Sequence, residues 1–203
     1  MTITNGYCTL AEYKAWNSIT TTNATDDGVI EDIVESVSRQ IDNLCGRHFF
    51  VTTAIARYFK ADHGGQDMLF IDDLSSTTSL AIVSDDDGDG TYENTWTTTD
   101  YNVMPYQPQS SAPYTMIETT PDGDFVFSAQ KKGNKITGLW GWTAVPDDVK
   151  VACLIMVDAE YHARDGQSLS TTTSITPAGI VLTPAGVPKT AMDKLRPYIR
   201  NFI

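Results

Sequence analysis

The segment from Lys135 to Gly166 constrains the fold most, because a short β-strand leads directly into an almost wholly apolar helix. Pro146 suits the first helical position, where its missing N–H costs no hydrogen bond, and two aspartates follow it at the positive end of the helix dipole. From Val149 to Val157 no clear polar stripe interrupts the apolar residues. We therefore expect this helix to be buried all round, either by a large core or by a neighbouring subunit.

Two further helices are expected nearer the N-terminus. Thr9 and Glu12 have the spacing of a capping box, which opens a short helix. Asp26 and Asp27 can cap the start of a second helix, and Gly46 supplies its stop. Between these ends, apolar residues recur at the helical period: Ile30, Ile33, Val34, Val37, Ile41, Leu44 and Cys45.

The pattern changes between Val51 and Ile136, where short β-rich segments alternate with turn residues. This pattern predicts an inserted antiparallel β-subdomain, with an extended loop over Pro105–Pro113. The expected strands are Ala54–Phe59, Met68–Ile71, Ser79–Val83, Thr91–Thr97, Tyr114–Glu118, Phe125–Phe127 and Ile136–Trp140.

The part of the chain that follows the apolar helix is a polar, β-branched arm, for which the sequence predicts no secondary structure of its own. Its apolar residues Ile180, Val181 and Leu182 are expected to dock as a strand on another surface, such as a neighbouring subunit. The chain then continues in a short helix from Lys189, which Pro197 should end or kink.

Together these elements define an α+β fold class. A helical core is made of the N-terminal helices and the long buried helix, with an inserted antiparallel β-subdomain and an extended C-terminal arm ending in a short helix. The expected division is 1–50 for the N-terminal helical part of the core, 51–143 for the β-rich insertion, 144–166 for the long core helix, and 167–203 for the arm and terminal helix.

The formal net charge of −12 argues against an ordinary DNA-binding protein, which needs a basic face to neutralise phosphates. No run approaches the roughly 18 apolar residues of a membrane span, and the N-terminus lacks the features of a secretory signal. We therefore expect synthesis in a cytoplasm and no contact with a membrane. The three cysteines form no C-x-x-C pair and are expected to be reduced.

Catalytic motifs are not found in the sequence. The three histidines have no metal-ligand spacing, and there is neither a nucleophile elbow nor a phosphate-binding loop. Adjacent acids such as Asp72 and Asp73 cannot be assigned acid and base roles without tertiary geometry. We therefore expect that the protein is not an enzyme, and a hydrolase whose acidic residues converge only in the fold stays as an alternative.

The sharpest chemical motif is an aspartate-rich segment in which three aspartates alternate and a glycine follows, as in the first half of a calcium loop. An EF-hand is excluded, because Trp96 occupies the twelfth position and no helix is expected on either side. The alternative is a solvated hairpin turn in which Asp-Gly pairs supply positive φ angles. No cofactor is expected unless this segment holds calcium, with Asp85, Asp87, Asp89 and Glu93 as its ligands.

Segments along most of the chain resemble one protein family. They occur in the order Thr9–Tyr13, Ile41–Phe49, Asp86–Glu93, and Thr137–Trp142 followed by Val145-Pro146. Together they look like the head-tail connector (adaptor, head completion) proteins of long-tailed bacteriophages. Each segment is structural rather than catalytic, so the resemblance lies in their order and spacing.

The resemblance implies a structural virion protein that is located at the head-tail interface and made in the host bacterial cytoplasm. Connectors of this family form a homo-oligomeric ring of about a dozen copies beneath the portal protein. The ring extends the DNA channel and provides the docking platform for a stopper or tail-completion protein. Viral DNA would pass through without specific binding, and an acidic lumen would repel its phosphates.

The same resemblance implies that the C-terminus reaches toward the portal. Intramolecular packing of the terminal residues is the alternative to this docking role. The residues expected to dock are Leu195, Arg196, Tyr198, Arg200 and Phe202.

Two other functions compete with the adaptor. One is a neighbouring stopper or tail-completion protein, against which the helical content favours the connector. The other is a calcium-dependent β-rich adhesion or carbohydrate-binding module, which the aspartate-rich segment and the four tryptophans favour.

Overall fold

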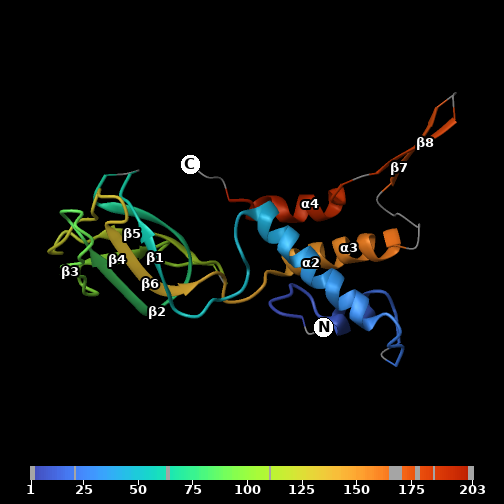
Figure 1. Ribbon diagram of the computed structural model, residues 1–203, viewed down its shortest axis with the longest axis horizontal. Helices are drawn as coiled ribbons and strands as arrows, with labels where there is room; N and C mark the ends of the chain where they lie inside the picture. The colour runs from blue at the N-terminus through green and yellow to red at the C-terminus, as the bar shows by residue number, and fades with distance from the viewer. Residues whose placement is uncertain are drawn as a thin grey trace. The chain divides into compact units, whose positions relative to one another are not determined.

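The computed structural model describes residues 3–20, 22–62, 65–109, 111–164, 171–176, 179–184 and 186–200 of the 203-residue chain. The chain divides into two compact units. Unit 1 comprises residues 1–48 and 145–203 and contains the helices, whereas unit 2 comprises residues 49–144 and contains an antiparallel sheet (Figure 1). The ends of the insertion expected from the sequence, 51 and 143, lie within two residues of these divisions.

The helices of unit 1 are α1 (Leu10–Trp16), α2 (Asp27–Cys45), α3 (Asp147–Arg164), α4 (Lys189–Leu195) and a 3₁₀ turn, η1 (Arg196–Tyr198). The predicted capping box of α1 is confirmed, because the Glu12 N–H donates to Thr9 Oγ1 at 3.1 Å and the Thr9 N–H donates to the Glu12 carboxylate at 2.8 Å. Gly46 ends α2 with a φ of 64°, a conformation that glycine adopts without strain. Pro197 lies in η1, just after α4 has ended, as predicted.

Asp26 does not cap α2, although it occupies the position before the helix. Its carboxylate accepts a hydrogen bond from the Tyr161 hydroxyl at 2.9 Å and lies 3.4 Å from the Arg164 guanidinium. The prediction of a local cap was wrong because these tertiary partners on α3 take the same carboxylate oxygens. Asp26 therefore joins the start of α2 to the end of α3.

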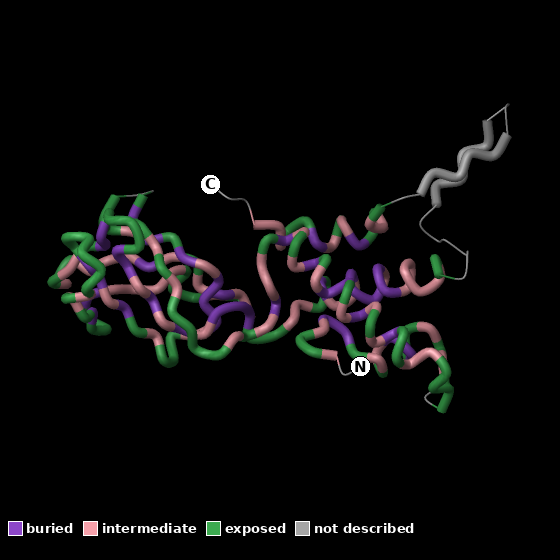
Figure 2. The backbone as a smooth tube through the Cα atoms, viewed as in Figure 1, coloured by how far each residue is buried: buried purple, intermediate pink, exposed green. Residues whose placement is uncertain are grey.

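The core of unit 1 forms where α2 and α3 pack together. On α3, Val151 and Ile155 lie one turn apart and are only half-buried, so the helix is buried over most of its circumference but not all round (Figure 2). No helix in the described part of the chain is both long and apolar enough to cross a membrane. The buried residues of the two helices are Ile30, Val34, Val37, Ile41 and Cys45 from α2, and Val149, Ala152, Cys153, Leu154, Met156 and Val157 from α3.

The sheet of unit 2 has the strand order β1-β6-β2-β5-β4, and β3 pairs with β2. Every pairing is antiparallel, as predicted. The inward side chains form a core that includes Leu69, Ile82, Ile117 and Trp140. The strands are β1 (Ile55–Phe59), β2 (Met68–Ser84), β3 (Asn94–Thr95), β4 (Tyr101–Met104), β5 (Tyr114–Thr119) and β6 (Asn134–Trp140).

Two predicted strands, Met68–Ile71 and Ser79–Val83, are parts of one long strand. β2 runs through both and shifts its register against β6 near Ser79, whose φ is 61°. The polar residues there had predicted a turn, but they form an irregularity within the strand instead. Strand β4 was not predicted, because it is short and ends just before Pro105.

Phe125–Phe127 was predicted as a strand and is irregular in the structure. The Phe127 ring stacks on Trp96 with centroids 4.5 Å apart, and its N–H donates to the Gln66 carbonyl at 2.8 Å. Because both phenylalanines contact Trp96, the apolar pattern reports packing between aromatic rings rather than strand pairing.

The two ends of the insertion lie together within unit 2. Gly141, with a φ of 107°, turns the chain as β6 ends, and its N–H donates to the Asp73 carbonyl at 2.7 Å. Trp142 then packs on Phe49 with ring centroids 5.4 Å apart and donates its indole N–H to the Asp73 carboxylate at 3.0 Å. These contacts return the chain close to the point at which the insertion began.

The arm has secondary structure of its own, contrary to prediction. β7 (Thr171–Thr176) and β8 (Gly179–Pro184) form an antiparallel two-stranded sheet, in which Ile180 lies opposite Ile175. Threonine and isoleucine favour strands because their branched side chains suit a pleated backbone. The strand that pairs with Ile180, Val181 and Leu182 is therefore β7 of the same arm, whereas the sequence had predicted a partner on another surface.

Glu12 is predicted to stabilise unit 1 in a pH-dependent way, because it also accepts a hydrogen bond from Lys150 of α3 at 2.8 Å. Burial, the largest single influence, raises the pKa of Glu12, but the hydrogen bonds from Lys150 and Thr9 together outweigh it and lower the pKa. A carboxylate with a lowered pKa stabilises the fold above its unfolded pKa, and this contribution disappears as pH falls through the folded value.

We expect Glu12→Gln to lose on the order of 1 kcal/mol of unfolding free energy at pH 7, from the weakened cap and the lost ion pair. The difference in unfolding free energy between this variant and the unmodified protein should disappear at acidic pH, below the ordinary Glu pKa of 4.5. Urea denaturation at several pH values measures it, with the exposed Asp32→Asn as the control. A difference that stays constant with pH would contradict this assignment.

Candidate metal site and docking residues

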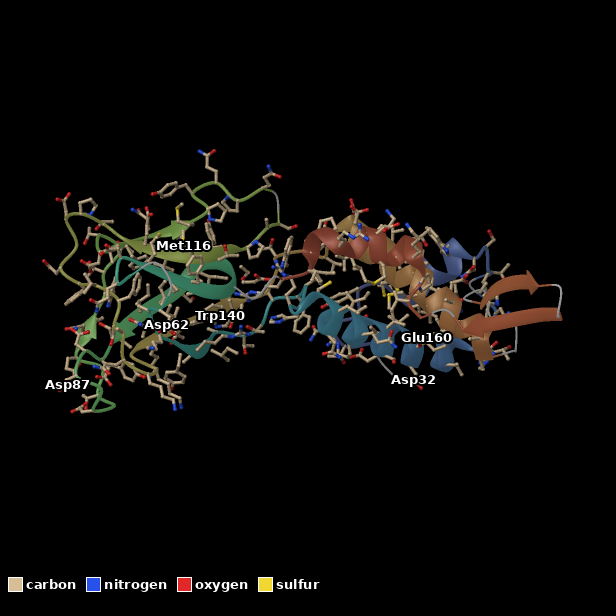
Figure 3. All side chains as sticks on the ribbon, turned by 90° about the horizontal axis from the view of Figure 1, so that it is seen from above. Asp32, Asp62, Asp87, Met116, Trp140 and Glu160 are labelled. Atoms are coloured by element: carbon tan, nitrogen blue, oxygen red, sulfur yellow. The ribbon has the colours of Figure 1, made fainter. Side chains whose placement is uncertain are left out.

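The loop between β2 and β3 brings together the four carboxylates that the sequence had singled out. One oxygen from each of Asp85, Asp87, Asp89 and Glu93 lies within 4.8 Å of the others. Asp85 is buried and the other three are exposed, with Asp87 on a loop at the margin of unit 2 (Figure 3). The structure therefore places the predicted ligands at distances that one cation could bridge.

The Asp85 carboxylate holds the backbone of this loop in place by hydrogen bonds. Its two carboxylate oxygens accept the backbone N–H groups of Gly88, at 2.6 Å, and Gly90, at 2.9 Å. Its own N–H donates to the Gly133 carbonyl at 2.8 Å, which ties the loop to the turn before β6. Asp85 is thus a structural residue whether or not an ion binds.

Asp87 and Asp89 also form the local turns that the hairpin alternative requires. Asp87 accepts the Asp89 N–H at 3.1 Å, and Asp89 accepts the Thr91 N–H at 2.7 Å. The hydrogen bonds from Thr91 lower the pKa of Asp89, so it is ionised at neutral pH. A carboxylate oxygen can accept more than one partner, so this turn geometry is compatible with an ion. An all-oxygen set of this kind suits calcium rather than zinc.

The C-terminal docking candidates are held largely by their own unit. Leu195 is fully buried, which favours the intramolecular alternative for this side chain over a docking role. The Tyr198 side chain is half-buried, and burial followed by the nearby Asp148 and Asp147 carboxylates raises its pKa. The Arg200 N–H donates to the Cys45 carbonyl at 2.8 Å, which fixes the end of the described chain beside α2.

Arg196 remains available for docking, because its side chain is 78% exposed and, among the described residues, pairs with the single carboxylate of Asp193 at 3.5 Å. Phe202 lies outside the described residues. The three interface candidates of the arm, Ile180, Val181 and Leu182, lie in β8 and pair in register with β7.

Two cavities in the described part of unit 1 are lined by acidic residues. A cavity of about 300 Å³ lies among α2, α3 and the start of α4, and Glu160 is the carboxylate that lines it. A second, of about 20 Å³, is lined by Asp26 and Asp27 and has room for about one water molecule. Lys14 lies 2.5 Å from Asp27, and Arg164 lies near Asp26, so these acids are already engaged by cations.

The cysteines and histidines add no further candidate site. All three cysteines are free and buried, with Cys8 and Cys153 in contact at 3.5 Å between their sulfur atoms. His162 lies 3.4 Å from Asp158 one turn earlier on α3. Among the described residues, the aspartate loop is the one group of three or more potential metal ligands.

Solved structures that are similar to this chain include the necks of two GTA (gene transfer agent) particles. The neck of an empty GTA particle, computed with C6 symmetry, matches with a TM-score of 0.57 and 12% identity over 100% of this chain and 94% of that chain. The neck of a native GTA particle, computed with C12 symmetry, matches with a TM-score of 0.51 and 12% identity over 96% and 89%. No family model and no curated protein matches. The likeness shows a shared fold over almost the whole chain.

Replacement of Leu195 tests whether this side chain stabilises the fold by packing or serves as a docking residue. We expect Leu195→Ala to cost about 2–5 kcal/mol of unfolding free energy, because it removes a fully buried side chain. The neighbouring Arg196→Ala, on the exposed side, should change stability by no more than about 0.5 kcal/mol. Chemical denaturation followed by helical circular dichroism measures both, and equal small effects would restore Leu195 as a docking residue.

Proposed function

We propose that this chain is a structural subunit of a phage-type neck, a head-tail connector or adaptor that forms a ring beneath a portal. The observation that carries the proposal is the likeness to two GTA neck structures over nearly the full length of both partners. The order of sequence motifs points to the same family independently. In this role the protein works by assembly rather than by turnover.

Several properties of the chain support a ring of about a dozen copies around a DNA channel. The similar neck structures were computed with sixfold and twelvefold symmetry. A net charge of −12 would keep the phosphates of passing DNA from adhering to the ring. The protein is then made in the host cytoplasm and resides in the virion at the head-tail interface, where a stopper or tail-completion protein docks on it.

A connector subunit needs contacts with the portal and with neighbouring copies, and the C-terminal part of this chain offers residues for both kinds of contact. Arg196, with Tyr198 and Arg200, provides positive and aromatic groups for the portal, as does Phe202 in the same segment. The β7–β8 sheet has two strands, so each strand has an outer edge that a strand of a neighbouring copy can join. Ile180, Val181 and Leu182 lie on one of these strands.

Mass photometry of the purified chain mixed with the portal of the same phage tests this function. We expect a portal-bound particle that gains about a dozen copies of the 22.3 kDa chain. Arg196→Glu should weaken this binding, because it reverses an exposed positive charge, whereas Lys189→Glu on the preceding turns serves as the control. A chain that never joins portal but binds a preassembled connector ring would identify a stopper instead.

We also propose that the β2–β3 loop binds a structural calcium ion, with Asp85, Asp87, Asp89 and Glu93 as ligands. The observation that favours it is the approach of four carboxylate oxygens to within 4.8 Å of one another. Four negative charges at this distance repel one another unless a cation joins them. The tryptophans give little support to an adhesion module, because Trp96, Trp140 and Trp142 are buried and only the fourth, Trp16, is half exposed.

Isothermal titration calorimetry tests the ion site. We expect binding in the range of about 10⁻⁴–10⁻³ M, as in exposed extracellular calcium modules, together with a rise in thermal stability. Asp87→Asn with Asp89→Asn should abolish both, because the amides keep the turn hydrogen bonds but lose the charge. Asp122→Asn with Asp124→Asn makes the same charge change elsewhere in unit 2 and should leave binding intact. Absence of heat at millimolar calcium would leave the loop as a hairpin turn.

A further inference from the structure

Positive charge in unit 2 is confined to one edge of the sheet. Acidic residues outnumber basic ones there by more than two to one. All the basic residues lie on β1, on β6 or directly beside them, and β1 is an edge strand that pairs with β6. They are Arg57, Lys60, Lys131, Lys132 and Lys135.

Two of these cations are neutralised within the chain, and three are not. Arg57 lies 2.6 Å from Asp72, and Lys60 lies 2.5 Å from Asp62. Among the described residues, no carboxylate pairs with the lysines at 131, 132 and 135. Their charge is therefore available to a partner.

These lysines are interleaved with tyrosines. Lys135 lies directly opposite Tyr58 in the β1–β6 register, and its ammonium group lies 5.5 Å from the centre of the Tyr92 ring. The Lys132 ammonium lies 5.8 Å from the centre of the Tyr58 ring, which is half exposed. Tyrosine is enriched in protein interfaces, and a cation held beside its ring combines charge with apolar contact. We call Tyr58, Tyr92, Lys131, Lys132 and Lys135 the lysine-tyrosine surface.

The strands at the other end of the sheet order present the opposite charge. Asp67, Asp122 and Asp124 are exposed where β5 ends, beside the start of β4. The turn is held in place because the Thr119 N–H donates to the Asp67 carbonyl at 2.9 Å and the buried Asp100 carboxylate accepts the Asp124 N–H at 3.2 Å. Asp67, Asp122 and Asp124 form what we call the acidic turn, and no cation pairs with these side chains among the described residues.

We propose that the lysine-tyrosine surface of one copy binds the acidic turn of the next copy in the ring. This inference rests on the proposed ring function and names one of its lateral contacts. Two different, complementary patches at opposite ends of the strand order make a heterologous contact, which generates a closed ring when the rotation between copies is right. Unit 2 thus carries both halves of a repeating interface.

DNA is the other partner that lysines and tyrosines suit, and the neighbouring charges disfavour it. Tyr92 belongs to the aspartate loop, and its hydroxyl donates to the Lys132 carbonyl at 2.9 Å. The loop therefore sets its carboxylates beside the lysines, where they would repel a phosphate backbone. An acidic protein turn that bears three localised carboxylates can be accommodated more easily than a continuous line of phosphates.

Charge reversal tests the contact in rings assembled on the portal. We expect two double variants, Lys132→Glu with Lys135→Glu and Asp122→Lys with Asp124→Lys, to bind the portal in fewer copies. At about 0.15 M salt and a limiting concentration of this chain, the number of bound copies should fall about tenfold. All four changes together should restore assembly, because the pairing is then reversed rather than lost. Lys189→Glu, a reversal outside unit 2, should have no effect. Circular dichroism verifies that each variant is folded.

Carbodiimide cross-linking of mixed ¹⁴N- and ¹⁵N-labelled protein identifies the neighbours directly. Mixed-isotope links between Lys132 or Lys135 and the acidic turn support the proposal. Portal-bound rings that assemble with links only elsewhere overturn it and leave the connector function standing, whereas a wild-type chain that forms no ring even on the portal overturns both. Duplex DNA that binds the wild-type ring but not a Lys132→Glu, Lys135→Glu ring of unchanged size would assign this surface to DNA and overturn the proposal.

Discussion

The structure depends on the two ends of the inserted β-unit lying side by side. α2 precedes the insertion and α3 follows it, and the core of unit 1 exists only when these two helices meet. Within unit 2, Phe49 packs on Trp142, and the Thr52 N–H donates to the Trp140 carbonyl at 2.8 Å, so the two ends of the insertion lie side by side. The buried Asp73 holds this closure, because it accepts from both Gly141 and Trp142. A β-unit with its ends together can be inserted between two helices without preventing their packing.

Features set by neighbouring residues could be predicted from the sequence, and features set by distant residues could not. The capping box at Thr9 and the stop at Gly46 involve groups within one turn of each other, so the sequence contains the whole interaction. Asp26 carries the same local cap signal, yet its carboxylate is taken by side chains of α3 that lie more than a hundred positions along the chain. Phe125–Phe127 has a strand-like apolar pattern, but the packing of its rings on Trp96 decides the conformation.

The same distinction explains which parts of the candidate sites were found. The aspartate loop is a local motif, so the four carboxylates that cluster there could be predicted from the sequence. Leu195 was assigned to docking because the sequence shows that it is apolar but not which surface covers it. The lysine-tyrosine surface was missed because it is assembled from β1, β6 and the loop before β3, and only the pairing of Tyr58 with Lys135 brings these segments together.

A polar contact between copies has a consequence for how a ring would form. Charged patches of this size are weakened by salt and give modest affinity, so isolated copies would stay apart at physiological ionic strength. A portal that bound each C-terminal segment, as proposed, would hold neighbouring copies at high effective concentration, and the lateral contacts would then form without large apolar surfaces. Weak lateral contacts that need a template would confine assembly to a finished head, because free copies would not form rings on their own.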